Sequence, residues 1–413
     1  MPARNLVKLL KRRIEKNKAS VAKWLFAMRL HPKTESNHLQ VLTTAQSQLE
    51  SCDQFESESN YLGSKDPIIR QWHELGKKIK LAYQGKYVEK SDWRVLIQVP
   101  PAHASTAGYS LLNSLAESFS YIGIPSEVLR WGQDTAKTLS TFRPTVFLCS
   151  DFPEYVKNVD WDAVHAFRKR QKLLLGTTAS LEAYGNTPLE GRIRWAKDNQ
   201  VDFFYSYRDS SYVLNSTDYR SYHTAGLPIL FLPFGANILH YYPVPDIERD
   251  LNFVLLASRK HRHLEFMKTV CHLEDGFIDG PGGWPHVKDF NFNRDRDRYI
   301  YARAQVGLNI HQPDQVSSPS ELNERTYQLA ACGVPQLMDH PKLLETLGLN
   351  ELFNVADSPS DFTDLYISIK RDYDKALDKA LRAQREILLN HTTFNRAEEF
   401  IRQLNSFFNT GPS

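Results

Sequence analysis

From residue 93 onward, short apolar runs alternate with longer segments that mix apolar and polar residues at helical spacing. The longer segments predict helices at residues 110–121 and 164–171. The apolar runs predict strands at residues 93–99, 127–131, 144–149, 172–176, 201–205 and 228–232. Strands that alternate with helices at this spacing are typical of βαβ units on a parallel sheet.

The same alternation restarts after a proline-containing joint at residues 242–246. It predicts helices at 263–272 and 295–304, and strands at 251–256, 276–279, 306–311 and 335–338. A chain of 413 residues is too long for one hydrophobic core. We therefore expect two consecutive α/β domains, preceded by a polar helical region of 88 residues.

Residues 318–337 are the most informative segment of the chain. Ser318 and Glu321 fit a capping box, and Pro319 would occupy the first helical position. Gly333 suits the left-handed residue just past the helix end. The pattern therefore predicts a capped helix that leads directly into a buried strand.

Three polar residues share one face of this predicted helix by their i,i+3 and i,i+4 spacing: Glu321, Arg325 and Gln328. A helix N-terminus carries partial positive charge and unpaired N–H groups. With an arginine and an amide side chain added, it is suited to hold a phosphate and a sugar.

This segment resembles the donor-binding region of group 1 glycosyltransferases, in particular the branch named after spore-maturation proteins. The recurring pattern there is N-x-R-x-[FY]-E-x-x-A-C-G-x-x-x-L, which fits the residues from Asn323 to Leu337 except at Gln328. Residues 232–237, 301–311 and 391–397 resemble neighbouring parts of the same family. The likeness extends over roughly residues 200–405.

The resemblance implies the GT-B fold, an α/β architecture in which two Rossmann-like domains face each other across a cleft. We expect an extra N-terminal basic helical extension at residues 1–88, an acceptor domain at 89–244 and a donor domain at 245–390. The last segment, 391–413, is expected to be a helix that packs back toward the N-terminal domain.

The implied activity is transfer of a hexosyl or deoxyhexosyl group from a nucleotide-sugar to a glycan, glycolipid or glycoprotein, with retention of configuration, as in polysaccharide biosynthesis. The nucleotide, whether UDP, GDP or dTDP, stays open, and no other cofactor is expected.

Candidate donor-binding residues lie in loops after the predicted strands, where ligands of open α/β sheets bind. Cations are unfavourable at helix N-termini, so the cationic loop at residues 257–262 indicates a nearby anion, and Arg259 is the candidate to stabilise the leaving diphosphate. The resemblance adds the glycine–tryptophan turn at residues 279–284. Together the candidates are Ala107, Gly108, Ser258, Arg259, Arg262, Gly282, Gly283, Asn309, His311, Ser317, Ser318, Asn323, Arg325 and Gln328.

Gln328 stands where the resembled family usually carries a glutamate that binds the ribose hydroxyls, and Ser320 where the wider superfamily carries a second acid. A glutamine can accept from one hydroxyl and donate to another. The two departures support an alternative in which the protein binds nucleotide or glycan without catalysing transfer.

The loop after the first strand holds the small residues Ala107 and Gly108, which related enzymes place beneath the phosphate of the transferred sugar. His103 in this loop is a candidate acceptor-site base, and Asp151 is a candidate to orient or deprotonate the acceptor. Each of these two residues is, by itself, more typical of a structural or lining position.

Asp295 and Asp297 have the aspartate-x-aspartate spacing of metal-dependent transferases, but three arginines flank and separate them. Such a run is typical of a solvated helix start. We therefore predict no metal ligand here and metal-independent transfer.

The net charge of +3 is too small to indicate nucleic acid as a partner. Four scattered cysteines favour a reducing, cytoplasmic location. Residues 1–30 hold nine basic residues against one acid and predict an amphipathic helix. Such a helix suits an anionic membrane surface, which would make the protein peripheral on the inner face of the membrane, or packs on the rest of the protein. A membrane-associated scaffold is a further alternative.

Overall fold

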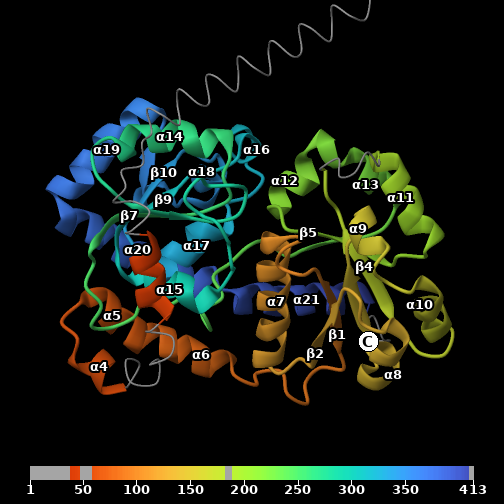
Figure 1. Cartoon of the computed structure of the whole chain (residues 1–413). Helices are drawn as coiled ribbons and strands as arrows, with labels where there is room; N and C mark the ends of the chain where they lie inside the picture. Colours follow the sequence, from red (N-terminus) through yellow and green to blue (C-terminus); the bar gives the residue numbers. More distant parts are fainter. Residues whose placement is uncertain (1–37, 47–57, 182–187, 409–413) are drawn as a thin grey trace, which may run out of the picture.

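The computed structural model describes residues 38–46, 58–181 and 188–408 (Figure 1). The predicted basic helix at residues 1–30 lies outside this part of the chain. The described residues form two α/β units side by side, each built on its own sheet. In the part of the chain described, no helix is both long and apolar enough to cross a bilayer.

The first sheet has six parallel strands in the order β2-β1-β3-β4-β5-β6. Its central strands are buried throughout because helices cover both faces, which is usual for parallel sheets. We call this unit the N-terminal domain. Its strands are β1 (Val95–Val99), β2 (Ser126–Arg130), β3 (Val146–Cys149), β4 (Leu174–Thr178), β5 (Phe203–Ser206) and β6 (Ile229–Phe231).

The helices of the N-terminal domain begin at polar caps: Ser105, Asp134 and Asp160 each accept a backbone N–H of the helix that follows. The helices are α7 (Thr106–Tyr121), α8 (Thr135–Phe142), α9 (Pro153–Val156), α10 (Trp161–Arg168), α11 (Leu189–Asp198), α12 (Ser210–Asn215), η2 (Thr217–Tyr219) and α13 (Arg220–Ala225).

The second sheet has five parallel strands in the order β11-β10-β9-β7-β8 and forms the C-terminal domain. Its strands are β7 (Leu251–Leu256), β8 (Phe277–Asp279), β9 (Ala304–Asn309), β10 (Gln336–Asp339) and β11 (Asn354–Ala356). Its helices are α14 (His261–Cys271), α15 (Arg294–Ala302), α16 (Pro313–Ser317), α17 (Glu324–Ala331), α18 (Leu343–Leu347), η3 (Asn350–Leu352) and α19 (Pro359–Arg371).

The two sheets share one topology, because β8-β7-β9-β10-β11 repeats the order β2-β1-β3-β4-β5. In each sheet the second strand lies on one side of the first and the third strand lies on the other. The boundaries β1/β3 and β7/β9 are therefore the switch points where ligands of open α/β sheets bind. The expected α/β architecture of two Rossmann-like units is confirmed.

The end of the chain returns to the first domain. Helix α20 (Tyr373–Asn390) packs on α17, and α21 (Thr393–Phe408) crosses to pack on α7 (Figure 1). The ring of Phe400 lies 6.0 Å from Phe119 and 6.2 Å from Phe203. Thr393 accepts a hydrogen bond from the Ser118 hydroxyl at 2.6 Å. This crossing ties the two domains together.

Before β1, a helical segment packs against both the interdomain linker and the C-terminal helices. It comprises α4 (Glu58–Gly63), α5 (Pro67–Gln71), the π-helical turn η1 (Trp72–Gly76) and α6 (Lys77–Tyr83). Trp72 stacks on Tyr242 of the linker at 5.0 Å. The Gln71 side chain donates to Gln384 of α20, and Tyr87 donates to Glu398 of α21.

The predicted capping box at Ser318 and Glu321 is wrong. The short helix α16 ends at Ser318, and α17 begins only after Asn323, whose Oδ1 accepts the Thr326 N–H at 3.1 Å. The residues between are held in a non-helical path because the Ser320 carbonyl accepts the Asp209 N–H of the other domain at 2.7 Å. The left-handed residue past the helix end is confirmed at Gly333, with φ of 68°.

Gly333 and Gly348 provide a matched test of how the N-terminal segment packs. Both have φ of 68°, but a Cβ at Gly333 would lie 2.0 Å from Cγ2 of Ile68 in α5, whereas a Cβ at Gly348 would meet no atom within 4 Å. We expect Gly348→Ala to cost about 1–2 kcal/mol for the left-handed backbone alone. Gly333→Ala should cost about 1–3 kcal/mol more because of overpacking.

Urea denaturation of both variants measures this difference. Equal losses in the two would contradict the packing of α5 on Gly333.

Candidate active site

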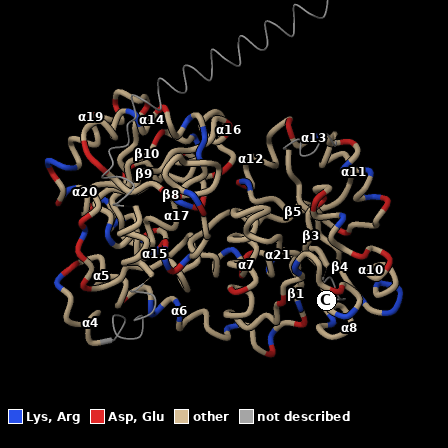
Figure 2. Tube along the Cα trace, viewed as in Figure 1, with Lys and Arg blue, Asp and Glu red and all other residues tan. Residues whose placement is uncertain are grey.

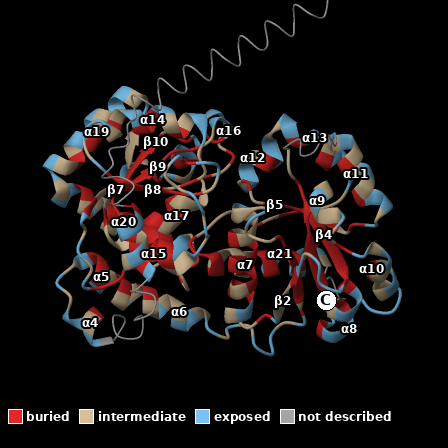
Figure 3. Cartoon of the chain, in the orientation of Figure 1, coloured by how far each residue is buried: buried red, intermediate tan, exposed pale blue. Residues whose placement is uncertain are grey.

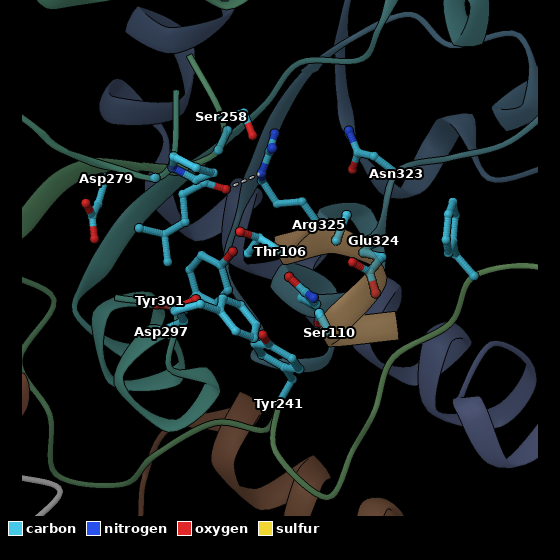
Figure 4. Close-up of a pocket in the computed structure, with 18 of the residues that line it drawn as sticks. Thr106, Ser110, Tyr241, Ser258, Asp279, Asp297, Tyr301, Asn323, Glu324 and Arg325 are labelled. Carbon is cyan, nitrogen blue, oxygen red and sulfur yellow. Dashed lines mark hydrogen bonds between the residues drawn. The ribbon is translucent and has the colours of Figure 1, made fainter. Parts of the chain in front are cut away.

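A cavity of about 300 Å³ lies at the carboxyl ends of β7 and β8, and we call it the C-domain cavity. Ala257 and Ser258 after β7, and Asp279 and Gly280 at the end of β8, form one wall. Helices α15 and α17 form another, and the start of α7 from the other domain closes it (Figure 4). The cavity is therefore built at the switch point of the second sheet.

Arg325 on the first turn of α17 lies deep in the C-domain cavity (Figure 4). Its Nε donates to the Leu256 carbonyl at 3.0 Å and its Nη1 to Asn309 Oδ1 at 3.4 Å. Burial lowers the pKa of this guanidinium. The two bonds fix its orientation and leave other guanidinium N–H groups without an acceptor among the described residues, so the site is suited to an anionic ligand.

The start of α15 contributes buried charges to the same cavity. Arg296 pairs with Asp279 at 3.1 Å and with Asp297 at 2.6 Å. Burial raises the pKa of Asp297 to about 6, although Arg296 opposes this. The prediction of a solvated helix start is wrong here, because α15 packs its charged first turns inward; Figure 3 shows most of α15 as buried.

The turn after β8 requires a glycine. Gly280 has φ of 144°, and a Cβ there would lie 2.2 Å from the Ala257 carbonyl oxygen. The loops after β7 and β8 thus touch each other and together shape the cavity wall. Within residues 38–46, 58–181 and 188–408, no group of three or more His, Cys, Asp or Glu side chains is placed to hold a metal ion.

A second cavity, of about 260 Å³, lies at the carboxyl ends of β1, β3, β4 and β5, and we call it the N-domain cavity. Its walls are rich in aromatic rings and hydroxyl groups, among them Phe152, Tyr155 and Tyr205. Tyr207 and Phe234 stack with ring centres 5.8 Å apart. Such walls suit the faces and hydroxyl groups of a sugar.

The two cavities adjoin, because Ala107, Phe234, Glu321 and Glu324 line both. Glu321 accepts a hydrogen bond from Gln315 at 2.9 Å. Burial raises the pKa of Glu324 to about 7. Molecules bound in the two cavities would therefore meet beside these carboxylates.

Charged contacts hold the domains together around the cavities. Glu117 of α7 pairs with Arg294 of α15 at 2.7 Å and with His240 of the linker at 3.1 Å. Burial alone would raise the pKa of Glu117, but hydrogen bonds from His240 and Arg294 lower it to about 2. Arg208, which follows β5 in the N-terminal domain, and Asp314 of α16 in the C-terminal domain approach to 3.5 Å. Figure 2 shows that most other charged residues are interleaved along the outer helices.

Several residues predicted from the sequence lie in the cavities. Ser258, Asn323, Arg325 and Gln328 line the C-domain cavity. Ala107 lines both cavities, and Gly108 lines the N-domain cavity. A Cβ at Gly108 would lie 2.6 Å from the Tyr155 hydroxyl, so a larger residue would displace that side chain.

The glycine–tryptophan turn and Arg259 lie just behind the C-domain cavity wall. Pro281 lines the cavity and accepts the Arg259 N–H at 2.9 Å, whereas Arg259, Gly282 and Gly283 do not line it. Arg259 Nε is buried without a hydrogen-bond partner among the described residues.

Three other predicted donor residues form a hydrogen-bonded layer beneath the cavity floor. Arg262 and His311 both bind Asp339, at 2.8 and 2.7 Å. Asn309 donates to Thr326 at 2.9 Å and accepts from Arg325. These side chains satisfy one another, so the structure gives them a supporting position and not a direct one.

Ser317 and Ser318 do not reach either cavity. Their hydroxyls donate to the Asp314 carbonyl, at 3.3 and 2.8 Å, within the last turn of α16. The expected hydroxyl contact with phosphate therefore has no support in their geometry.

Neither acceptor-site candidate of the first domain lines a cavity, although Asp151 lies directly behind the N-domain cavity wall formed by Ser150, Phe152 and Thr178. His103 is exposed on the loop before α7. Asp151 is buried, with two bonds from Arg192 at 2.7 and 2.6 Å and one from Thr178 at 2.8 Å. This carboxylate is held in a structural ion pair and is not placed to take a proton from an acceptor.

Four charged residues of the C-domain cavity were not among the predicted site residues. Asp279, Arg296, Asp297 and Glu324 all line the C-domain cavity. Glu324 sits inside the motif, between Asn323 and Arg325, and that adjacency was the available signal. Asp279, Arg296 and Asp297 line the cavity because α15 packs against the end of β8, and no local sequence pattern predicts that contact.

Comparison with known proteins agrees with this architecture. Residues 255–402 match the model of a family described as glycosyl transferase-like. A comparison with curated protein sequences gave no match. The match begins in β7 and runs through the C-terminal domain into α21.

Among solved structures, HepE of Anabaena, solved with UDP and glucose, is similar at 11% identity with a TM-score of 0.50, over 76% of this chain and 100% of HepE. The phage T4 β-glucosyltransferase, solved with UDP and Mn²⁺, shares 11% identity at a TM-score of 0.47, over 76% and 98% of the two chains. The two facing parallel-sheet domains and the HepE likeness define the GT-B fold.

The ion pair of Asp151 and Arg192 allows a test of its structural role. Arg192→Met should cost about 3–5 kcal/mol of unfolding free energy, because it leaves Asp151 buried without its cation. Replacing both residues, as in Asp151→Leu with Arg192→Met, should recover most of the loss. Urea denaturation gives both values. A loss below about 1 kcal/mol in Arg192→Met would contradict the structural role.

Proposed function

We propose that the protein is a glycosyltransferase that moves a sugar from a nucleotide-sugar to a hydroxyl group of a glycan, glycolipid or glycoprotein. The observation that carries the proposal is the pair of adjoining cavities at the carboxyl ends of two facing parallel sheets. A two-substrate reaction requires two sites that meet at the reacting atoms. The glycosyl transferase-like match over residues 255–402 supports this choice.

In the proposal the nucleotide-sugar occupies the C-domain cavity. The guanidinium of Arg325 binds the diphosphate, and Ser258 contributes a hydroxyl. Gln328 and Asn323 take the ribose side, where Gln328 can both accept and donate a hydrogen bond. UDP is the first nucleotide to test, because HepE of the same fold was solved with UDP.

The acceptor occupies the N-domain cavity, whose aromatic and hydroxyl walls match a carbohydrate. We place the acceptor domain at residues 89–244 and the donor domain at 245–390. Arg259, behind the Pro281 turn, adds positive charge near the diphosphate. Membership of the spore-maturation-like branch and retention of configuration belong to the same proposal and rest on the resemblance. Metal-independent transfer is also part of it and is supported by the pairing of Arg296 with Asp297, which offsets the charge that a divalent cation would need.

Arg325 provides the main test. We expect Arg325→Ala to lower the transfer rate by about 10²–10³-fold, roughly 3–4 kcal/mol, because it removes a desolvated cation from the leaving diphosphate. A thermal-shift screen with UDP, GDP, dTDP and CMP measures nucleotide binding, and release of nucleotide from the matching sugar donors measures turnover. Arg371→Ala, on the exposed end of α19, is the matched control.

Wild-type binding and turnover in Arg325→Ala would contradict the assignment of the phosphate site. So would the absence of any nucleotide shift in the wild type.

A second candidate is a protein that binds nucleotide or glycan without transfer. The observation that favours it is Gln328, which lines the C-domain cavity where the resembled family carries a glutamate. Nucleotide binding without turnover of any donor in the panel would identify this case. The membrane-scaffold alternative concerns residues 1–30, outside the described part.

A further inference from the structure

Glu324 is the first residue of α17 and lies where the two cavities meet. It lines the C-domain cavity together with Arg325 (Figure 4). It also lines the N-domain cavity, together with Tyr207. Asn323 caps the helix immediately before it and fixes the backbone that carries its side chain. Its carboxylate therefore faces the boundary between the proposed donor and acceptor.

Glu324 differs from the other carboxylates that line these cavities. Asp279 and Asp297 both pair with Arg296, and Glu321 accepts a hydrogen bond from Gln315. No described residue donates a hydrogen bond to Glu324. Glu324 is partly buried and lines both cavities, so its carboxylate is available to a bound molecule.

The surroundings of Glu324 raise the pKa of its carboxyl group, so that it can accept a proton near neutral pH. Burial raises its pKa to about 7, and the positive charge of Arg294 on α15 opposes the rise. Three tyrosine hydroxyls also lie in its electrostatic surroundings, from the loop after β5, from the linker and from α15: Tyr207, Tyr241 and Tyr301. The other charged groups that line the two cavities are Arg208, Asp279, Arg296, Asp297, Glu321 and Arg325.

We propose that Glu324 is the general base that receives the proton of the acceptor hydroxyl. The inference rests on the proposed function. The acceptor oxygen forms its bond to the anomeric carbon on the face from which the phosphate leaves, as retention requires, and its proton passes to a carboxylate oxygen of Glu324. The bond from the anomeric carbon to the phosphate oxygen breaks, and its electron pair leaves with the nucleoside diphosphate beside Arg325.

The position of Glu324 fits this role better than those of His103 and Asp151. His103 is exposed outside both cavities, and Asp151 is occupied by Arg192 and Thr178. Glu324 and Arg325 are adjacent in the chain, so one helical turn holds both the proton acceptor and the cation that faces the leaving group.

The test compares Glu324→Gln and Glu324→Asp with the wild-type protein. UDP-glucose, GDP-mannose and dTDP-glucose serve as donors, with octyl β-glucoside and water as acceptors. We expect Glu324→Gln to bind the nucleotide as the wild type does but to turn over about 10²–10⁴-fold more slowly. The acidic limb of the wild-type pH–rate profile near pH 7 should disappear in this variant.

Glu324→Asp keeps a carboxylate and should retain that limb at a reduced rate. Glu265→Gln, an exposed carboxylate on α14, is the matched control and should behave as the wild type.

A second measurement does not depend on turnover. A carboxyl group whose pKa is higher in the folded than in the unfolded state destabilises the fold as pH rises from about 4.5 to about 7. The melting temperature of Glu324→Gln relative to wild type should therefore rise between pH 5 and pH 8. A pH-independent difference would overturn the inference.

The outcomes separate this inference from the proposed function. Wild-type turnover with an unchanged acidic limb in Glu324→Gln overturns the base role alone. Nucleotide binding by the wild type without any turnover also overturns the base role and leaves donor binding intact. Absence of nucleotide binding by the wild type overturns both.

Discussion

The two cavities depend on the fixed position of one domain relative to the other. Each cavity takes residues from both domains, so neither exists unless the carboxyl ends of the two sheets face each other. Helix α21 maintains this relation by crossing back onto α7, and the segment from α4 to α6 packs over the linker and the C-terminal helices. The ion pair of Glu117 and Arg294 adds a direct tie between the domains. The catalytic geometry proposed here is thus a property of domain packing and not of either sheet alone.

Most of the strands could be predicted from the sequence because buried parallel strands are continuous apolar runs. The strand at residues 251–256 has the predicted bounds, and the other predicted strands differ by one or two residues at their ends. Strand β11 was missed because it is three residues long and begins with a polar asparagine. The start of α17 was misplaced because the Asp209 contact with Ser320 comes from the other domain, and no local capping pattern contains that information.

The sequence predicted only those cavity residues that belong to a recognisable local motif. Asn323, Arg325 and Gln328 follow one another on one helix, and all three line the C-domain cavity. Residue type alone did not separate ligand-facing groups from buried ion pairs. Arg262 and Arg325 are both arginines near strand ends, yet Arg262 is neutralised by Asp339 while Arg325 has only neutral acceptors. Tertiary packing decides which of these two arginines pairs with a carboxylate of the protein.

The lack of a carboxylate partner for Arg325 has an energetic cost. Holding a buried guanidinium on a carbonyl and an amide oxygen costs free energy, because neither acceptor supplies a full negative charge. The same holds with opposite sign for Glu324, a partly buried carboxylate to which no described residue donates a hydrogen bond. Two adjacent residues of one helix therefore retain opposite, incompletely compensated charges. A diphosphate beside Arg325 and a hydroxyl proton beside Glu324 would compensate both at once, so the first turn of α17 is less stable empty than with both substrates bound.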